Sequence, residues 1–231
     1  MQASGATFSS VDTVGPGLTY PSLLLLCSSG RVGHPLLRSA LERGYRVKVL
    51  VWDPSRLRVK AQDRLELVQG DARDTDLLNE LLRHNVDAVL STLGKYIKRP
   101  ESPMTEMTST LLDAMKRNQV RRLICLSSLG VGESRRYGGL VEQYVVRIVL
   151  RHVLADKFTQ EQLIRKSGLD WTLLRPPRIL DEEFSRRYDV WQQLPAGVKP
   201  SWKISKVDAA TEMLNLLESP ASVGQTLHLS Y

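Results

Sequence analysis

The sequence predicts an α/β fold: a doubly wound, mostly parallel sheet with helices on both faces, built as a single domain. Short apolar runs alternate along the chain with segments of helical periodicity, which is typical of consecutive βαβ units. The composition agrees, because 42% hydrophobic and 25% charged residues among 231 are ordinary values for a globular chain. A glycine-containing turn between the first strand and the first helix is the third observation that favours this class.

Each strand is predicted from a short apolar or β-branched run that is bounded by turn residues. The expected strands are Leu23–Cys27, Arg46–Val51, Leu65–Val68, Val86–Ser91, Arg122–Ser127, Asp170–Arg175 and Thr226–Leu229. The first run is continuously apolar, as expected of a central strand that is buried on both faces.

The helices between these strands are predicted from apolar residues three and four positions apart. The expected helices are Pro35–Leu41, Asp74–Leu82, Pro103–Asn118, about Leu140–Lys166 and Ser205–Glu218. Asp74, Ser102 and Ser205 are expected to cap helix N-termini. Residues 177–202 interrupt the alternation with prolines, charges and aromatics, and we expect a small irregular region there, on the substrate side of the sheet.

Residues 22–231 are expected to form the domain, and residues 1–21 a flexible N-terminal extension. The extension lacks Lys and Arg, and no apolar run is long enough to span a bilayer, so neither a secretory signal nor a membrane helix is expected. The two cysteines, Cys27 and Cys125, have no spacing typical of a disulfide framework or a metal site. We therefore expect no metal and a reducing, cytoplasmic location, with organelle targeting as the alternative.

The charge balance suggests an anionic ligand or surface, because 32 basic and 25 acidic residues leave a formal net charge of +7. The arginine pairs are scattered along the chain: Arg121-Arg122, Arg135-Arg136 and Arg186-Arg187. Only 6% of the residues are aromatic, and no motif that reads nucleic acid is present. Nucleic-acid binding is therefore not expected.

The turn after the first strand carries the most chemical information. Gly30 and Gly33 would let the backbone approach a pyrophosphate at the N-terminus of the next helix. Asp53 follows the second strand, twenty residues after Gly33, where an acidic residue reads a ribose hydroxyl. However, no G-x-G-x-x-G occurs, and Cys27 occupies the first position of the looser G-x-x-G-x-x-G. These residues alone support a dinucleotide turn and a plain turn about equally.

Further motifs follow the strands in order. They are Gly30–Gly33, Leu50–Ser55, Gly70–Ala72, Ser91–Gly94, Ser127–Gly132, Ala155–Lys157, Glu161–Thr172, Arg175–Pro177 and Ile204–Asp208. The set resembles the atypical short-chain dehydrogenase/reductase superfamily, in particular the NAD(P)-binding proteins similar to biliverdin-IXβ/flavin reductase and the NmrA-like proteins. The resemblance implies a Rossmann-like fold, NADP as cofactor with NAD as the alternative, a small-molecule substrate, and a monomer or homodimer.

The resemblance also implies roles for individual positions. The cofactor-binding positions would be Cys27, Ser29, Gly30, Arg31, Val32, Gly33, Trp52, Asp53, Arg56, Asp71, Ala72, Thr92, Leu93, Gly94, Lys157, Pro176 and Pro177. The catalytic positions would be Ser127, Ser128 and Lys157. Lys157 matches the lysine that binds the nicotinamide ribose in typical members.

The sequence departs from the family pattern at the general acid. Typical members carry a tyrosine four residues before the lysine, on the same helix face, but Val153 stands there. Reductases of the biliverdin-IXβ type also lack that tyrosine, so the resemblance implies an NAD(P)H-dependent reductase of a flat, conjugated acceptor, such as a flavin, quinone or tetrapyrrole. The proton is expected from water or from a side chain that the sequence does not identify. One alternative is a non-catalytic NAD(P)-binding sensor, regulator or assembly scaffold; another is an interaction module without cofactor. Glu161, one turn after Lys157, is expected on the surface, although it could face the site.

Overall fold

The computed structural model describes residues 20–26, 29–57, 59, 63–94, 101–137, 144, 148–183, 185, 187–193 and 201–231. Its strands are β1 (Ser22–Leu26), β2 (Arg46–Val51), β3 (Leu65–Gln69), β4 (Ala88–Ser91), β5 (Arg122–Leu126), β6 (Asp170–Arg175), β7 (Arg178–Leu180), β8 (Asp189–Trp191), β9 (Lys203–Ser205) and β10 (Gln225–Ser230). The helices are α1 (Gly33–Glu42), α2 (Thr75–Arg83), α3 (Pro103–Arg117), α5 (Arg151–Arg165) and α6 (Lys206–Glu218), with short 3-10 turns η1 (Pro54–Arg56), η2 (Gly132–Arg136) and η4 (Pro220–Ser222).

The main sheet confirms the predicted fold class. Its order is β3-β2-β1-β4-β5-β6-β10-β8, and all neighbours from β3 to β10 are parallel. The strand order reverses between β1 and β4, where Leu26 lies beside Ser91. In doubly wound sheets, ligands bind at the carboxyl edge of such a switch point.

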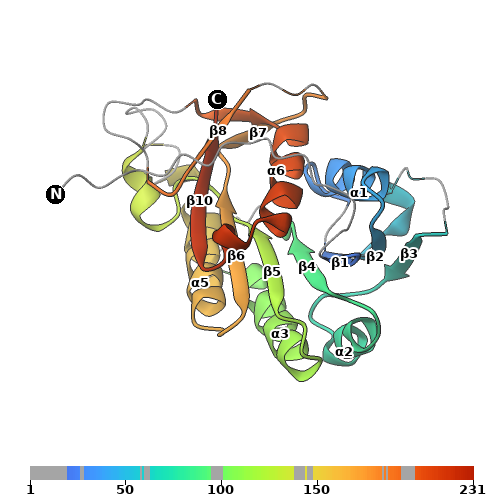
Figure 1. Ribbon diagram of the computed structural model, residues 1–231. Coiled ribbons are helices and arrows are strands. Elements are labelled where there is room, and N and C mark those ends of the chain that lie inside the picture. Colours follow the sequence, from blue (N-terminus) through green and yellow to red (C-terminus); the bar gives the residue numbers. More distant parts are fainter. Residues whose placement is uncertain are drawn as a thin grey trace.

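Helices cover both faces of this sheet (Figure 1). Helices α1 and α6 pack together on one face, while α2, α3 and α5 form the layer on the other. The side chains of β1 alternate between the two layers: Leu23 and Leu25 contact the first, and Leu24 and Leu26 contact the second. All four are at most 1% exposed, which confirms the prediction of a strand buried on both faces.

All three predicted cap residues stand at the N-cap position, and two of them make capping hydrogen bonds. Asp74 accepts hydrogen bonds from two backbone N–H groups of α2, and Ser205 accepts one from the N–H group of Asp208. Ser102 is the N-cap residue of α3, followed by Pro103 as predicted, but its side chain makes no capping hydrogen bond. Instead, Asp156 of α5 accepts the Met104 N–H at 2.9 Å and thereby caps α3 from another helix.

The region that the sequence predicts to be irregular contains two short strands. Strand β8 pairs antiparallel with β10, and β7 pairs with β9. Burial explains why β8 forms: Val190 and Trp191 are only 2% and 7% exposed. The expected helix Leu140–Lys166 is described as α5 from Arg151, and of residues 138–147 only Tyr144 is described. No described helix is long and apolar enough to cross a bilayer.

Candidate dinucleotide-binding site

The turn between β1 and α1 leaves the start of α1 open to an anion. Helix α1 begins at Gly33, has no described side-chain cap and carries no acidic residue in its first turn. By contrast, α2 has Asp74 as its cap and Asp76 in its first turn. The His34 N–H already donates to the Gly30 carbonyl at 3.2 Å and Pro35 has no N–H, so the partial positive charge that can attract a phosphate lies at Gly33. The neighbouring Cys27 lies outside the described residues.

Arg31 joins this turn to the C-terminal part of the chain. Its guanidinium Nη1 donates to the carbonyl of Ile179 in β7 at 3.2 Å, although 148 positions separate the two residues in the sequence. The first turn and β7 therefore lie beside each other, at the carboxyl edge of the sheet.

The residues after β2 and β3 form the next part of this edge. Trp52 is 71% exposed. Asp53 accepts hydrogen bonds from the backbone N–H and the hydroxyl of Ser55, at 3.0 and 2.6 Å, and pairs with Arg56 at 3.4 Å. The Ser55 hydrogen bonds hold the pKa of the Asp53 carboxyl below its ordinary value. Asp53 is thus an ionised group that is oriented by its own turn.

Asp71, after β3, is also ionised and held by a local partner. Arg73 donates to it at 2.6 Å, and this hydrogen bond lowers the pKa of the Asp71 carboxyl. Ala72, between them, is buried in the cluster on the α2 side of the sheet. A ligand at this corner would therefore meet an aspartate–arginine pair.

The ends of β1 and β4 are tied together at the switch point. The backbone N–H and the hydroxyl of Thr92 both donate to the Leu26 carbonyl, at 3.2 and 3.1 Å. Leu93 is 1% exposed, while Gly94 is exposed. This edge therefore presents backbone, with little side chain to obstruct a ligand.

Lys157 reaches this edge from α5. Its side chain is only 6% exposed, and its Nζ donates to the carbonyls of Leu93 at 3.2 Å and Leu126 at 3.0 Å, and to Gln160 Oε1 at 3.4 Å. The ammonium therefore bridges the carboxyl ends of β4 and β5. Val153 is half-buried one turn earlier on α5, where its side chain has no proton to give.

Ser127 and Ser128 follow β5 but have different surroundings. The Ser127 hydroxyl is buried and donates to Glu161 Oε1 at 2.5 Å. The half-buried Ser128 hydroxyl donates to the carbonyl of Leu129 at 3.0 Å.

The expectation that Glu161 lies on the surface is wrong, because it is 1% exposed. Its position four residues after Lys157 turns it to the same helix face, toward the sheet.

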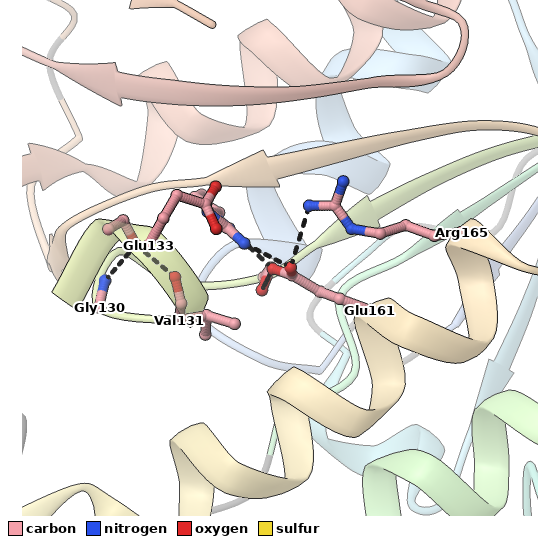
Figure 2. Close-up of polar contacts among 8 residues, drawn as sticks. Gly130, Val131, Glu133, Glu161 and Arg165 are labelled. Atoms are coloured by element: carbon pink, nitrogen blue, oxygen red, sulfur yellow. Dashed lines mark hydrogen bonds and ion pairs between the residues drawn. The ribbon is translucent and has the colours of Figure 1, made fainter. Parts of the chain in front are cut away.

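Glu161 belongs to a buried network that the sequence did not reveal (Figure 2). Arg175, at the end of β6, donates to both of its carboxylate oxygens, at 2.9 and 2.6 Å. Arg175 also donates to Glu133 of η2 at 2.6 Å, and Arg165 approaches Glu161 at 3.5 Å. Burial opposes ionisation of Glu133, but Arg175 outweighs it and holds the pKa of this carboxyl below its ordinary value. One signal in the sequence was available: an arginine directly follows two leucines at the buried end of the strand.

His228 of β10 borders this network. Its ring packs edge-to-face on Tyr137, with centroids 5.5 Å apart, and its Nδ1 has no hydrogen-bond partner among the described residues. Burial and the charge of Arg175 lower the pKa of His228 to about 4, so the ring is neutral at physiological pH.

Pro176 and Pro177 are both buried directly after β6. The carbonyl of Pro176 accepts the Leu129 N–H at 2.7 Å, which fixes the turn after β5 against the end of β6. The described residues contain no cluster of His, Cys, Asp or Glu suited to a metal ion.

Residues 28–220 match the family model described as NAD(P)H-binding. The chain belongs to this NAD(P)H-binding family. Among curated proteins, it is 26% identical over 156 residues to an uncharacterized chloroplastic protein of Arabidopsis thaliana, covering 64% of this chain and 56% of the relative. It is 24% identical over 160 residues to the photosystem II assembly factor Ycf39 of Cyanophora paradoxa, covering 67% and 44%. The chain thus spans about half the length of the curated relatives it matches.

Solved structures confirm the Rossmann-like fold of this NAD(P)H-binding protein. A short-chain dehydrogenase/reductase of Veillonella parvula in complex with NADP superposes with a TM-score of 0.78 at 15% identity, over 92% of this chain and 95% of that one. ChuY, an anaerobillin reductase of Escherichia coli O157:H7, superposes with a TM-score of 0.75 at 22% identity, over 90% and 96%. The resemblance to atypical short-chain dehydrogenases/reductases is thereby confirmed at the level of family and fold.

The residues present fit a dinucleotide. Apart from Cys27, the predicted cofactor-binding residues follow β1, β2, β3, β4 and β6 or lie on α5. Since these strands are parallel, the residues that follow them lie along one edge of the sheet. The start of α1, which has no side-chain cap among the described residues, lies at this edge with Gly33 foremost, where an anionic ligand would bind. The role of each residue in binding stays a prediction.

Proposed function

We propose that this protein is an NADPH-dependent reductase of a flat, conjugated acceptor such as a flavin, quinone or tetrapyrrole. The observation that supports this most directly is the position of Lys157, whose ammonium lies on the carbonyls of Leu93 and Leu126 at the switch-point edge. Its third proton meets Gln160 Oε1 at 3.4 Å, and a ribose hydroxyl would take the place of this long contact, at the position where the matching lysine of typical relatives binds the ribose. The reductase among the fold neighbours agrees with a reductive direction.

The chain's own residues would bind, orient and shield the reactants. The turn from Gly30 to Gly33 would hold the pyrophosphate, and Asp53 and Arg56 would meet the adenosine side. When bound, the dinucleotide supplies the hydride. Ser127 and the buried Pro176 would border the nicotinamide side.

The proton would come from water. Val153 cannot donate a proton, and the carboxylate of Glu161 accepts hydrogen bonds from Nε and Nη2 of Arg175. A conjugated acceptor suits such a site, because it spreads the charge that hydride addition creates and does not require a side-chain acid in contact. The site therefore suits conjugated acceptors as a class, and experiment decides which of them is reduced.

Binding and turnover test the proposal separately. The protein is titrated with NADPH and with NADH while tryptophan fluorescence is followed, and oxidation of the bound cofactor is then measured with a flavin, a quinone and a linear tetrapyrrole. We expect saturable binding, tighter for NADPH, and turnover with at least one acceptor. Lys157→Met should weaken binding, whereas Lys166→Met, an exposed lysine just after the same helix, should not. Failure of both dinucleotides to bind would overturn the proposal.

A dinucleotide-binding assembly scaffold is the second candidate. Two observations favour it: the valine at position 153, and the similarity to a relative that is named a photosystem II assembly factor. Saturable binding of NADPH without oxidation by any of the three acceptors would replace the first proposal with this one.

We also propose a reducing compartment, with the cytoplasm first and an organelle as the alternative that the name of the chloroplastic relative favours. A fluorescent fusion of the full chain, compared with one that lacks residues 1–21, distinguishes them. Import that depends on residues 1–21 would establish the organelle and assign the extension a targeting role.

A further inference from the structure

Ser127 and Glu161 share a buried hydrogen bond whose direction is set by the groups around Glu161. Oε1 accepts from the Ser127 hydroxyl at 2.5 Å and from Arg175 Nε at 2.9 Å. Oε2 accepts from Arg175 Nη2 at 2.6 Å and from Arg165 Nη2 at 3.5 Å. Guanidinium groups are permanently charged and only donate, so Glu161 between them is a carboxylate that only accepts.

A serine hydroxyl has a single proton to donate but two lone pairs to accept with. Because the Ser127 proton is directed at Glu161, the hydroxyl is left with accepting capacity only. Hydrogen bonds to charged groups are roughly twice as strong as neutral ones, so a ligand carbonyl would not readily recapture this proton. The neighbouring Ser128 differs, since its partner is a neutral backbone carbonyl.

Ser127 stands beside the group that is expected to hold the cofactor. Lys157 Nζ donates to the carbonyl of Leu126, the residue directly before Ser127. The backbone N–H of Ser127 donates to the Leu174 carbonyl at 2.7 Å, which fixes its main chain at the end of β5. Both the backbone and the hydroxyl of Ser127 are therefore held in place before a ligand arrives.

We infer that Glu161 is a positioning residue that makes Ser127 a hydrogen-bond acceptor in the site, so that the ligand group bound there must carry an N–H or O–H donor. This inference rests on the proposed function. In the proposed cofactor, the group of that chemistry on the nicotinamide is the carboxamide N–H. Ser127 would then select and orient the nicotinamide rather than polarise a substrate carbonyl.

The experiment compares two dinucleotides that differ at this donor. NADPH carries the carboxamide, while the reduced 3-acetylpyridine analogue replaces its NH2 group with methyl. The ratio of their dissociation constants, measured by fluorescence titration without turnover, reports the N–H contact. We expect wild-type protein to bind NADPH about 5- to 10-fold more tightly than the analogue, the value of one ordinary hydrogen bond.

Four variants test the two residues. Ser127→Ala should bring the ratio close to one, while Ser127→Thr, which keeps the hydroxyl, should preserve it. Glu161→Gln should lower the ratio, because an amide can donate to Ser127 as well as accept from it. Glu161→Asp keeps the charge facing Arg175 but withdraws the carboxylate from Ser127, so it should lower the ratio even if Glu161→Gln fails to fold.

Ser185→Ala is the control, since the exposed Ser185 also donates to a carboxylate, Asp208 Oδ1 at 2.5 Å, and is not among the predicted cofactor-binding residues. Its ratio should equal that of wild type. An unchanged ratio in Ser127→Ala, or equal binding of the two dinucleotides by wild type, overturns the inference while leaving the proposed function intact. Absence of NADPH binding by wild type overturns both.

Discussion

Arg175 and Glu161 face each other in the protein interior through two parallel hydrogen bonds, Nε to Oε1 at 2.9 Å and Nη2 to Oε2 at 2.6 Å. Both side chains are 1% exposed. The pair joins the carboxyl end of β6 to the middle of α5, the helix that also carries Lys157. It therefore holds α5, and with it the expected catalytic face, against the sheet.

Removing one partner of this pair should lower the free energy of unfolding much more than its share of the loss when both partners are replaced. Arg175→Met leaves Glu161 buried without its main partner, and we expect a loss of about 3–5 kcal/mol in the free energy of unfolding. The double variant with Glu161→Met should lose clearly less than the sum of the two single variants, because no unpaired charge remains. Urea denaturation of the four proteins measures this coupling.

The exposed pair Arg121–Asp170 provides the control, since its side chains are 62% and 41% exposed. Arg121→Met should change stability by less than about 1 kcal/mol. Strict additivity at Arg175 and Glu161 would show that the buried pair contributes nothing specific.

Asp156 should stabilise α3 although it belongs to α5. Its carboxylate accepts the backbone N–H groups of Met104 and Thr105, both at 2.9 Å. Asp156→Ala leaves these groups without an acceptor and should lower stability by about 1–3 kcal/mol. Hydrogen exchange of the Met104 and Thr105 amides should become faster. Asp113→Ala, an exposed aspartate on α3, should leave their exchange unchanged, and equal protection in Asp156→Ala would contradict the assignment.

His228 should make the protein sensitive to mild acid. Its pKa is about 4 in the folded chain, against an ordinary value of 6.5, so between these values the unfolded chain binds a proton that the folded chain excludes. Stability should therefore fall as the pH drops from about 6.5 toward 4, by at most about 3 kcal/mol. Arg175 opposes protonation, while Glu133 and Glu161 favour it.

The variant His228→Phe tests this origin, because it keeps a ring against Tyr137 but does not titrate. Urea unfolding at about pH 7 and about pH 5 should show a smaller loss than wild type. His84→Phe, at an exposed histidine, should retain the wild-type loss. If His228→Phe retained it as well, the acid sensitivity would have another source.

Glu212 should have the opposite effect to His228 on the pH dependence of stability, because it destabilises the folded chain as the pH rises. It is 4% exposed, accepts from the Tyr188 hydroxyl at 3.1 Å, and burial raises its pKa to about 6 from an ordinary 4.5. The folded chain therefore keeps this proton to higher pH than the unfolded chain, and stability is lost as the pH rises from about 4.5 through 6. Glu212→Gln, which cannot ionise but still accepts from Tyr188, should be about 1–2 kcal/mol more stable than wild type at neutral pH.

This gain should shrink to a few tenths of a kcal/mol near pH 4.5 and vanish only well below it, where Glu212 is protonated in both states of the wild-type chain. Urea denaturation at the two pH values measures it, with Glu80→Gln at an exposed position as the control. A gain that is equal at both pH values would point to packing rather than ionisation.

Local signals were sufficient for most of the secondary structure. The caps Asp74 and Ser205 act within one helical turn of themselves, so their effect could be predicted from spacing alone. Ser102 stands at the predicted cap position without making the capping bond, because the acceptor that satisfies α3 comes from Asp156, 52 residues away from Met104. A cap supplied by another helix leaves no local pattern.

The sequence by itself determined the alternation of strands and helices, the central buried strand, the glycine turn before α1, and the one-turn spacing that sets Lys157 after Val153. These properties depend on neighbours within about one helical turn or one strand, so periodicity and residue type express them. Tertiary structure alone decided that Glu161 is buried, that Arg175 and Glu133 are its network, and that Ser127 donates into it. These contacts join residues 14, 42 and 34 positions apart, and the packing of α5 against the ends of β5 and β6 brings Glu161, Arg175 and Ser127 together in the interior, with the exposed Glu133 at the border.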